Sequence, residues 1–178
     1  HADNRLLKHL ERCALSYQCR AAQNFFLRRW EAPLPTARHC NAACFGCISL
    51  QPEGACPANH ERIAFVPTAD EVAEVALLHF GRVEHAVASF GQGCEGEPLL
   101  NGTLLEESLR KVRAATDKGT LNLNTNASLP QTVRRLMAAG LDSLRVSIAS
   151  AREPLYNAYH APHGYTLADV RASAAAVK

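Results

Sequence analysis

The sequence predicts an α/β protein with a parallel sheet, because strand-like and helix-like segments alternate along most of the chain. From residue 68 onward, short apolar runs recur about every 20–30 residues with amphipathic stretches between them. Such alternation implies right-handed crossover connections and parallel strands. The 178 residues provide about four such units, so we expect an open, partial (β/α) barrel whose later strands are missing from this chain. It begins with His1 instead of Met, which suggests a trimmed chain.

The first 33 residues are expected to form an N-terminal helical extension. Leu6, Leu7 and Leu10 form an apolar stripe at helical spacing, and charged residues occupy the other face. Pro33 and Pro35 then interrupt the helical pattern. We therefore place the start of the core domain at residue 34 and its end at 178, with a brief first strand over residues 34–39.

The remaining elements follow from capping and periodicity signals. Thr68 and Glu71 form a capping-box sequence that opens a helix ending at Gly81, and Thr103 and Glu106 form a second one. A long polar connection over 48–66 precedes them. Strands are predicted over 83–90, 121–126 and 144–149, and helices over 68–80, 103–116, 130–139, 153–159 and 166–177.

Three of the seven cysteines share one short loop, at the spacing C-x3-C-x2-C: Cys40, Cys44 and Cys47. Three thiolates can hold three irons of a [4Fe-4S] cluster and leave the fourth iron open to a small molecule. Structural metal sites instead close their coordination with four ligands. Clustered cysteines are typical of metal or catalytic sites in a reducing compartment, so we expect a cytoplasmic protein.

This loop resembles the cluster loop of the radical S-adenosylmethionine (SAM) superfamily, and three later segments strengthen the resemblance. Glu95-Gly96-Glu97-Pro98 resembles the Gly-Gly-Glu motif, 123–127 resembles a Thr-Asn-Gly turn with Ala127 in place of glycine, and 144–148 resembles the fourth strand. The usual aromatic residue before the third cysteine is replaced by Gly46, with Phe45 one place earlier. The first three of these segments follow or end predicted strands, and Ser147 lies on the fourth strand, so all are expected at the edge where parallel α/β folds gather their sites.

The resemblance implies a radical SAM enzyme whose reduced cluster cleaves SAM to a 5′-deoxyadenosyl radical, which abstracts hydrogen from a substrate. It implies the cluster ligands Cys40, Cys44 and Cys47 and an external electron donor such as flavodoxin or ferredoxin. It also implies SAM contacts from six residues: Gly96, Glu97, Pro98, Asn124, Asn126 and Ser147. The substrate is not identified by the sequence.

Other interpretations stay open at this point. A non-catalytic module could close a metal site with a fourth thiol, Cys56 or Cys94, and an unrelated α/β enzyme would make the spacing a coincidence. Cys13 and Cys19 are interpreted as packing thiols in preference to ligands of an auxiliary cluster. The net charge of +2 gives no indication of nucleic-acid binding, and no apolar run approaches the roughly 18 residues of a membrane span.

Overall fold

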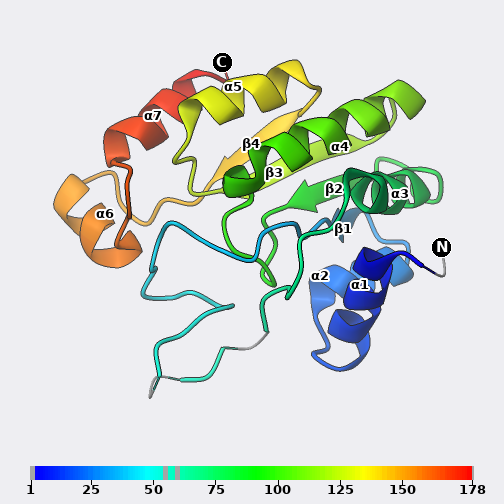
Figure 1. Ribbon diagram of the computed structural model, residues 1–178, viewed down its shortest axis with the longest axis horizontal. Coiled ribbons are helices and arrows are strands. Elements are labelled where there is room, and N and C mark those ends of the chain that lie inside the picture. The colour runs from blue at the N-terminus through cyan, green and yellow to red at the C-terminus, as the bar shows by residue number, and fades with distance from the viewer. Residues whose placement is uncertain (1–2, 54–55, 59–60, 178) are drawn as a thin grey trace.

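The computed structural model describes residues 3–53, 56–58 and 61–177. Within these residues, one parallel sheet contains four strands in the order β1-β2-β3-β4, which is also their order in the chain. The strands are β1 (Glu31–Pro33), β2 (Val87–Phe90), β3 (Thr120–Thr125) and β4 (Ser143–Val146). The sheet does not close on itself (Figure 1). The predicted α/β class and the open, partial barrel are confirmed.

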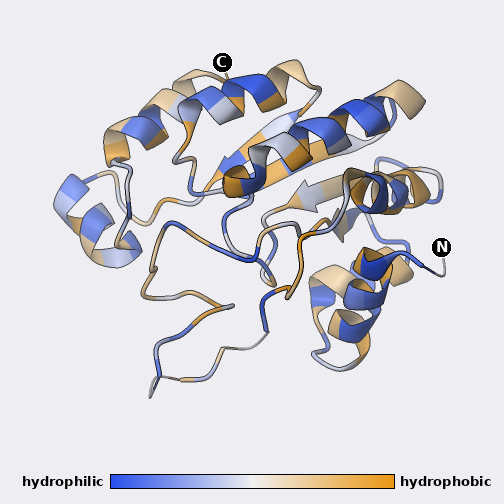
Figure 2. Ribbon diagram, viewed as in Figure 1, coloured by the Kyte–Doolittle hydropathy of each residue, from blue (hydrophilic) through white to orange (hydrophobic). Residues whose placement is uncertain are grey.

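One face of the sheet is covered by the three crossover helices and by α7, which follows the last strand (Figure 1). These are α3 (Ala69–Phe80), α4 (Gly102–Ala115), α5 (Pro130–Ala138) and α7 (Leu167–Ala175). Phe90, Leu121 and Leu123 are fully or almost fully buried in the core formed with these helices. Hydrophilic residues run along one side of α4 and α5 (Figure 2). The amphipathic pattern read from the sequence therefore matches this packing.

The first strand was predicted in the wrong place. The structure has it at Glu31–Pro33 and not over 34–39. Leu34 still donates its N–H to the carbonyl of Ser89 (2.8 Å), but the chain then leaves the sheet. Pro33 is tolerated because β1 is at the edge of the sheet, where a missing N–H costs no ladder bond.

Two other local predictions need correction. The helix predicted from Thr103 begins at Gly102, after a 3-10 turn, η1 (Pro98–Asn101), and the Thr103–Glu106 capping box does not form. Strands β2 and β4 are also shorter than predicted. The capping box at Thr68–Glu71 is confirmed.

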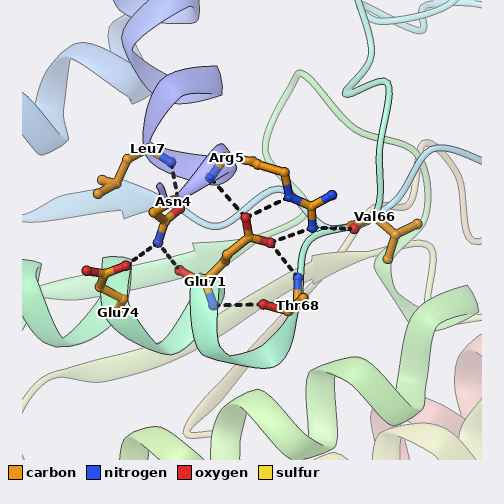
Figure 3. A network of polar contacts seen from close by, with 7 residues as sticks. All are labelled: Asn4, Arg5, Leu7, Val66, Thr68, Glu71 and Glu74. Carbon is orange, nitrogen blue, oxygen red and sulfur yellow. Dashed lines mark hydrogen bonds and ion pairs between the residues drawn. The ribbon is translucent and has the colours of Figure 1, made fainter. Parts of the chain in front are cut away.

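The N-terminal extension contains α1 (Arg5–Leu15) and α2 (Arg20–Phe26). Polar contacts join its start to the first turn of α3 (Figure 3). The guanidinium of Arg5 donates to both carboxylate oxygens of Glu71 (2.8 and 2.7 Å), and Asn4 donates to the Glu71 carbonyl (3.0 Å). No helix in the described ranges is long and apolar enough to cross a membrane.

Candidate cluster and cofactor site

The segments singled out from the sequence meet at the carboxyl edge of the sheet. The chain reaches the cysteine loop (residues 40–47) after β1, the Glu95–Pro98 turn after β2, Asn126 after β3 and Ser147 after β4. Parallel strands present these ends on the same side. The structure thus brings the predicted segments to one edge.

The cysteine loop is held by the end of α6 (Glu153–His160) through backbone hydrogen bonds. Ala43 donates to the carbonyl of His160 (3.1 Å), and Phe45 donates to that of Tyr159 (2.9 Å). His163 in turn donates to the carbonyl of Asn41 (2.9 Å). Each of the three cysteines in the loop is half-buried, so their thiols are accessible yet positioned.

The three thiols have different electrostatic environments. Burial raises the pKa of Cys40, and burial together with the neighbouring thiols raises the pKa of Cys44 to about 11. Burial also acts on Cys47, but contacts from Ser49, nearby backbone N–H groups and Arg62 outweigh it and lower the pKa of Cys47. A bound cation would relieve the repulsion among the thiolates, so this donor set fits an iron-sulfur group.

His160 adds a contact that the sequence did not reveal. Ala149 donates its N–H to His160 Nε2 (3.0 Å), which leaves the ring proton on Nδ1, and Nδ1 lies 3.3 Å from Cys44 Sγ. Burial lowers the pKa of His160, which favours this neutral form. His160 is therefore placed to donate a hydrogen bond to a candidate cluster ligand.

Gly96 lies against the backbone at the start of the loop. Its N–H donates to the carbonyl of Ala37 (2.7 Å), and Glu97 donates to that of His39 (2.8 Å). A Cβ on residue 96 would overlap the His39 carbonyl. Glycine is required here because two segments of backbone touch.

Glu95, which stands where the family motif has its first glycine, has a structural role beneath the loop. Its fully buried carboxylate accepts the N–H groups of Thr36 (2.7 Å) and Ala37 (2.9 Å) and that of Gly91 (2.5 Å). Burial raises the pKa of Glu95 to about 8, against the lowering effect of these donors. The departure from the motif thus ties the segment after β1 to the turn after β2.

The Glu97 carboxylate is also used within the protein. It accepts hydrogen bonds from the N–H groups of Leu99 (3.0 Å) and Asn126 (2.8 Å) and from the hydroxyl of Thr125. It is 3% exposed and caps η1, which begins at Pro98. The predicted contact of Glu97 with SAM has no direct counterpart in these bonds and stays a prediction.

Asn126 connects the end of β3 to the cysteine loop. Its side-chain amide donates to Asn41 Oδ1 (2.7 Å), and Asn41 donates to the Ser128 hydroxyl (3.0 Å). Ala127 adopts φ +56°, the left-handed conformation that favours glycine. The resemblance of this turn to Thr-Asn-Gly is therefore conformational, although the residue is alanine.

Asn124 and Ser147 lie farther along the same edge. Asn124 donates to the carbonyl of Phe90 (2.9 Å) and is paired in register with Arg145. Ser147 is exposed and donates its backbone N–H to the carbonyl of Thr125 (2.8 Å). Arg145 therefore shares the face of Asn124.

That face of the sheet, opposite the crossover helices, is polar. Ser143 donates to Asn122 Oδ1 (2.6 Å), and Asn122 donates to the Ser89 hydroxyl (3.1 Å). Ser89 donates to the Glu31 carboxylate (2.6 Å), so the row continues across all of the described strands. Ser89 and Asn122 are 0% and 6% exposed, so this row links the strands to one another, whereas Ser143 and Arg145 are more accessible.

A pocket of about 760 Å³ opens beside the cysteine loop. Cys44, Phe45 and Cys47 line it, together with Arg62 and Cys56 from the long connection. Cys94, the other thiol considered as a fourth ligand, lies instead within 4.8 Å of ligand atoms of His9 and Cys13. Of the two candidates, Cys56 is the one that lines this pocket.

No family model and no curated protein matches the sequence. Among solved structures, the chain is similar to HydG, a maturase of the [FeFe]-hydrogenase, with a TM-score of 0.55 and 19% identity. The match covers 98% of this chain and 38% of HydG. The likeness shows the fold. That fold is an open, partial (β/α) barrel.

Several residues of the site were missed by sequence reasoning. Glu95 was noted only as a departure from a motif, and Asn41 only as part of the loop. His160 lies one residue beyond the helix predicted over 153–159, and no sequence pattern pointed to a role for it at the site. Each acts through a contact with a residue distant in the chain, which local patterns do not contain.

Proposed function

We propose that the chain is the core of a radical SAM enzyme. The observation that carries the proposal is that the cysteine loop presents Cys44 and Cys47 to one pocket, while the Gly96 backbone contact and the Asn126–Asn41 bond hold the loop at the carboxyl edge of the sheet. The fold shared with HydG supports it. The motif resemblance and the fold similarity are separate observations, and both support the same proposal.

In this proposal Cys40, Cys44 and Cys47 hold a [4Fe-4S] cluster, and Gly96, Glu97, Pro98, Asn124, Asn126 and Ser147 surround SAM. The bound cluster and SAM would together supply reductive cleavage to a 5′-deoxyadenosyl radical that abstracts hydrogen from the substrate. The protein positions the ligands through α6 and the Gly96 contact, and His160 and Arg62 donate hydrogen bonds toward Cys44 and Cys47.

The partners follow from the same proposal. SAM, an external electron donor such as flavodoxin or ferredoxin, and a reducing cytoplasm are expected. The half-buried Ser143 favours a substrate with hydrogen-bonding groups, and the exposed Arg145 on the same face of β4 favours a negatively charged part.

A second function, a non-catalytic module with a closed four-cysteine site, is kept because Cys56 lines the same pocket as Cys44 and Cys47. The two functions differ in whether an iron is left open. Cys56→Ala should leave an open cluster intact and should disrupt a closed site.

The test is anaerobic reconstitution with iron and sulfide, followed by EPR of the reduced protein with and without SAM. A [4Fe-4S] signal that changes on adding SAM, and is retained in Cys56→Ala, is expected. Cys44→Ala should abolish the cluster because only two loop thiolates remain. A full cluster signal in Cys44→Ala, or a cluster that does not respond to SAM, would contradict the proposal.

A further inference from the structure

A second group of metal-ligand side chains lies away from the cysteine loop. His9 Nε2 or Nδ1, Cys13 Sγ and Cys94 Sγ all lie within 4.8 Å of one another. Cys13 and Cys94 are 0% and 3% exposed, and His9 is half-buried. His9 Nε2 is 3.4 Å from Cys13 Sγ. This group contains none of the thiols assigned to the proposed cluster.

The fold brings these residues together from two separate regions. His9 and Cys13 are four residues apart on α1 and so share one helix face. Cys94 belongs to the turn after β2, directly before Glu95, and its carbonyl accepts the N–H of Ile63 (2.8 Å). The buried Leu6 and Leu10 and the contacts of Asn4 and Arg5 with α3 (Figure 3) fix α1 on the core. The convergence is therefore built into the packing.

The spacing fits one tetrahedral ion better than a cluster. With metal–sulfur bonds of about 2.3 Å and metal–nitrogen bonds of about 2.0–2.1 Å, the ligand atoms of a zinc site are about 3.5–3.8 Å apart. The His9–Cys13 separation of 3.4 Å is just below this range, and the ligand atoms of all three residues lie within 4.8 Å of one another. Two thiols and an imidazole are ligands that zinc prefers.

We propose that His9, Cys13 and Cys94 bind a zinc ion, with Cys19 as the fourth ligand. Cys19 precedes α2, donates its N–H to the carbonyl of Cys13 (2.9 Å) and packs against the same core. His9 also lines a pocket of about 410 Å³ with Tyr17 and Arg62, which gives an ion a path from solvent.

Such an ion would fasten the N-terminal extension to the turn that carries Glu95 and Gly96. That turn contacts the segment leading to the cysteine loop. The zinc site would thus be structural, and it would help to position the cofactor site through the turn that carries Glu95 and Gly96. It does not depend on the proposed function, because a chain without a cluster would still bind zinc here.

The test uses the full chain with Cys40, Cys44 and Cys47 all changed to Ser, so that metal bound at the loop does not interfere. We expect about one zinc per chain by elemental analysis, and cobalt substitution should give the visible bands of a tetrahedral thiolate site. His9→Ala, at a half-buried position, should weaken zinc affinity at least about tenfold. Cys94→Ser should do the same, and Cys56→Ser, at an exposed thiol, is the matched control.

Three results would overturn the assignment: a chain that binds neither zinc nor cobalt, His9→Ala and Cys94→Ser variants with unchanged affinity, or a Cys13–Cys94 disulfide in the non-reduced peptide map. If the triple variant does not fold, the same titration of the wild-type chain and His9→Ala, without added iron, gives the decisive comparison. A Cys19→Ser variant with unchanged affinity would overturn Cys19 as the fourth ligand.

Discussion

Cys13 and Cys94 are buried between a helix and a turn of the core, whereas Cys40, Cys44 and Cys47 are half-buried in a loop without regular structure. The ligand atoms of Cys13, Cys94 and His9 lie within 4.8 Å of one another, which is close enough to bind a single ion. The cysteine loop borders a pocket of about 760 Å³, into which a larger group could enter. Burial and spacing thus separate a candidate structural site from a candidate reactive site, although both are made of cysteines.

The two regions are also fixed by different forces. The extension is fastened by buried leucines and by the bidentate Arg5–Glu71 pair. The cysteine loop is fastened by backbone contacts with α6 and with the Gly96 turn. A substitution that blocks a backbone contact should therefore affect the loop far more than the extension.

The largest effect is expected from Gly96→Ala. Its Cβ would overlap the His39 carbonyl, which is backbone and can move only with the loop, so we expect a destabilisation of about 3 kcal/mol and loss of cluster reconstitution. Thermal unfolding and iron-sulfur absorbance measure both.

Gly46→Ala is the matched control for Gly96→Ala. Its Cβ would meet the Tyr159 hydroxyl at 2.6 Å, the end of a side chain that can rotate. Tyr159→Phe should restore stability in the Gly46→Ala background and should not rescue Gly96→Ala. Equal behaviour of the two glycine variants would contradict the claim that backbone contact fixes the loop.

The next effect concerns the extension. Glu71 accepts hydrogen bonds from Arg5 and from the Thr68 N–H, and these lower its pKa to about 2 from the usual value of 4.5. The native state then binds fewer protons than the unfolded state, so this stabilisation is full above pH 4.5 and is lost as the pH falls toward about 2. Glu74, bonded to Asn4, and Asp70, paired with Lys111, are the other charged groups nearby.

Glu71→Gln should therefore cost about 1–2 kcal/mol at neutral pH, after allowance for solvent screening, and should flatten the acid side of the stability curve. Urea unfolding near pH 6 and near pH 3 measures this. Glu84→Gln, at an exposed position, is the control. An unchanged acid dependence in Glu71→Gln would show that another group controls the docking of α1.

Periodicity and capping signals were enough for most of the fold because they are local. The Thr68–Glu71 box and the helices α5 and α6 formed close to where they were predicted. The first strand was misplaced because its three residues become a strand only by pairing with β2, a contact 56 residues away in the chain. The predicted Thr103–Glu106 capping box does not form. Glu97 instead caps the 3-10 turn η1, which precedes α4.

The features of the candidate site also divide into those that are local in the sequence, which could be predicted, and those that depend on contacts between distant residues, which could not. Cysteine spacing and the Gly-Glu-Pro turn are contiguous, so the sequence could predict them. Glu95 acts on Thr36, Asn126 on Asn41 and His160 on Cys44, across 59, 85 and 116 residues respectively. No local pattern encodes such pairs, and without knowledge of the topology they could not be predicted.

A smaller effect is expected from His160→Ala. Removal of the ring costs about 1 kcal/mol because the Ala149 N–H loses its acceptor. The sharper consequence is a lower reduction potential of the proposed cluster, since a hydrogen bond to Cys44 stabilises the reduced, more negative state. Potentiometric EPR titration measures the shift, and the exposed His85→Ala is the control. An unchanged potential with full cluster occupancy would show that His160 only packs against Tyr156.

The smallest effect on stability is expected from Phe45→Ala, because Phe45 is 84% exposed and the change should stay within about 0.5 kcal/mol. Phe45 lines the pocket beside Cys44 and Cys47, one place before the position where the radical SAM family usually has its aromatic residue. If its ring stacks on bound SAM, the loss of about 1 kcal/mol corresponds to roughly fivefold weaker binding.

Equilibrium binding of SAM to the reconstituted protein measures this, with Phe26→Ala in α2 as the control, since Phe26 is 46% exposed but lies in the extension. Weaker binding in Phe45→Ala alone would assign the stacking contact to the shifted aromatic residue. Equal affinity in both variants would show that the loop backbone around Gly46 makes this contact without an aromatic ring. The cysteine loop would then bind SAM through the kind of backbone approach already seen at Gly96.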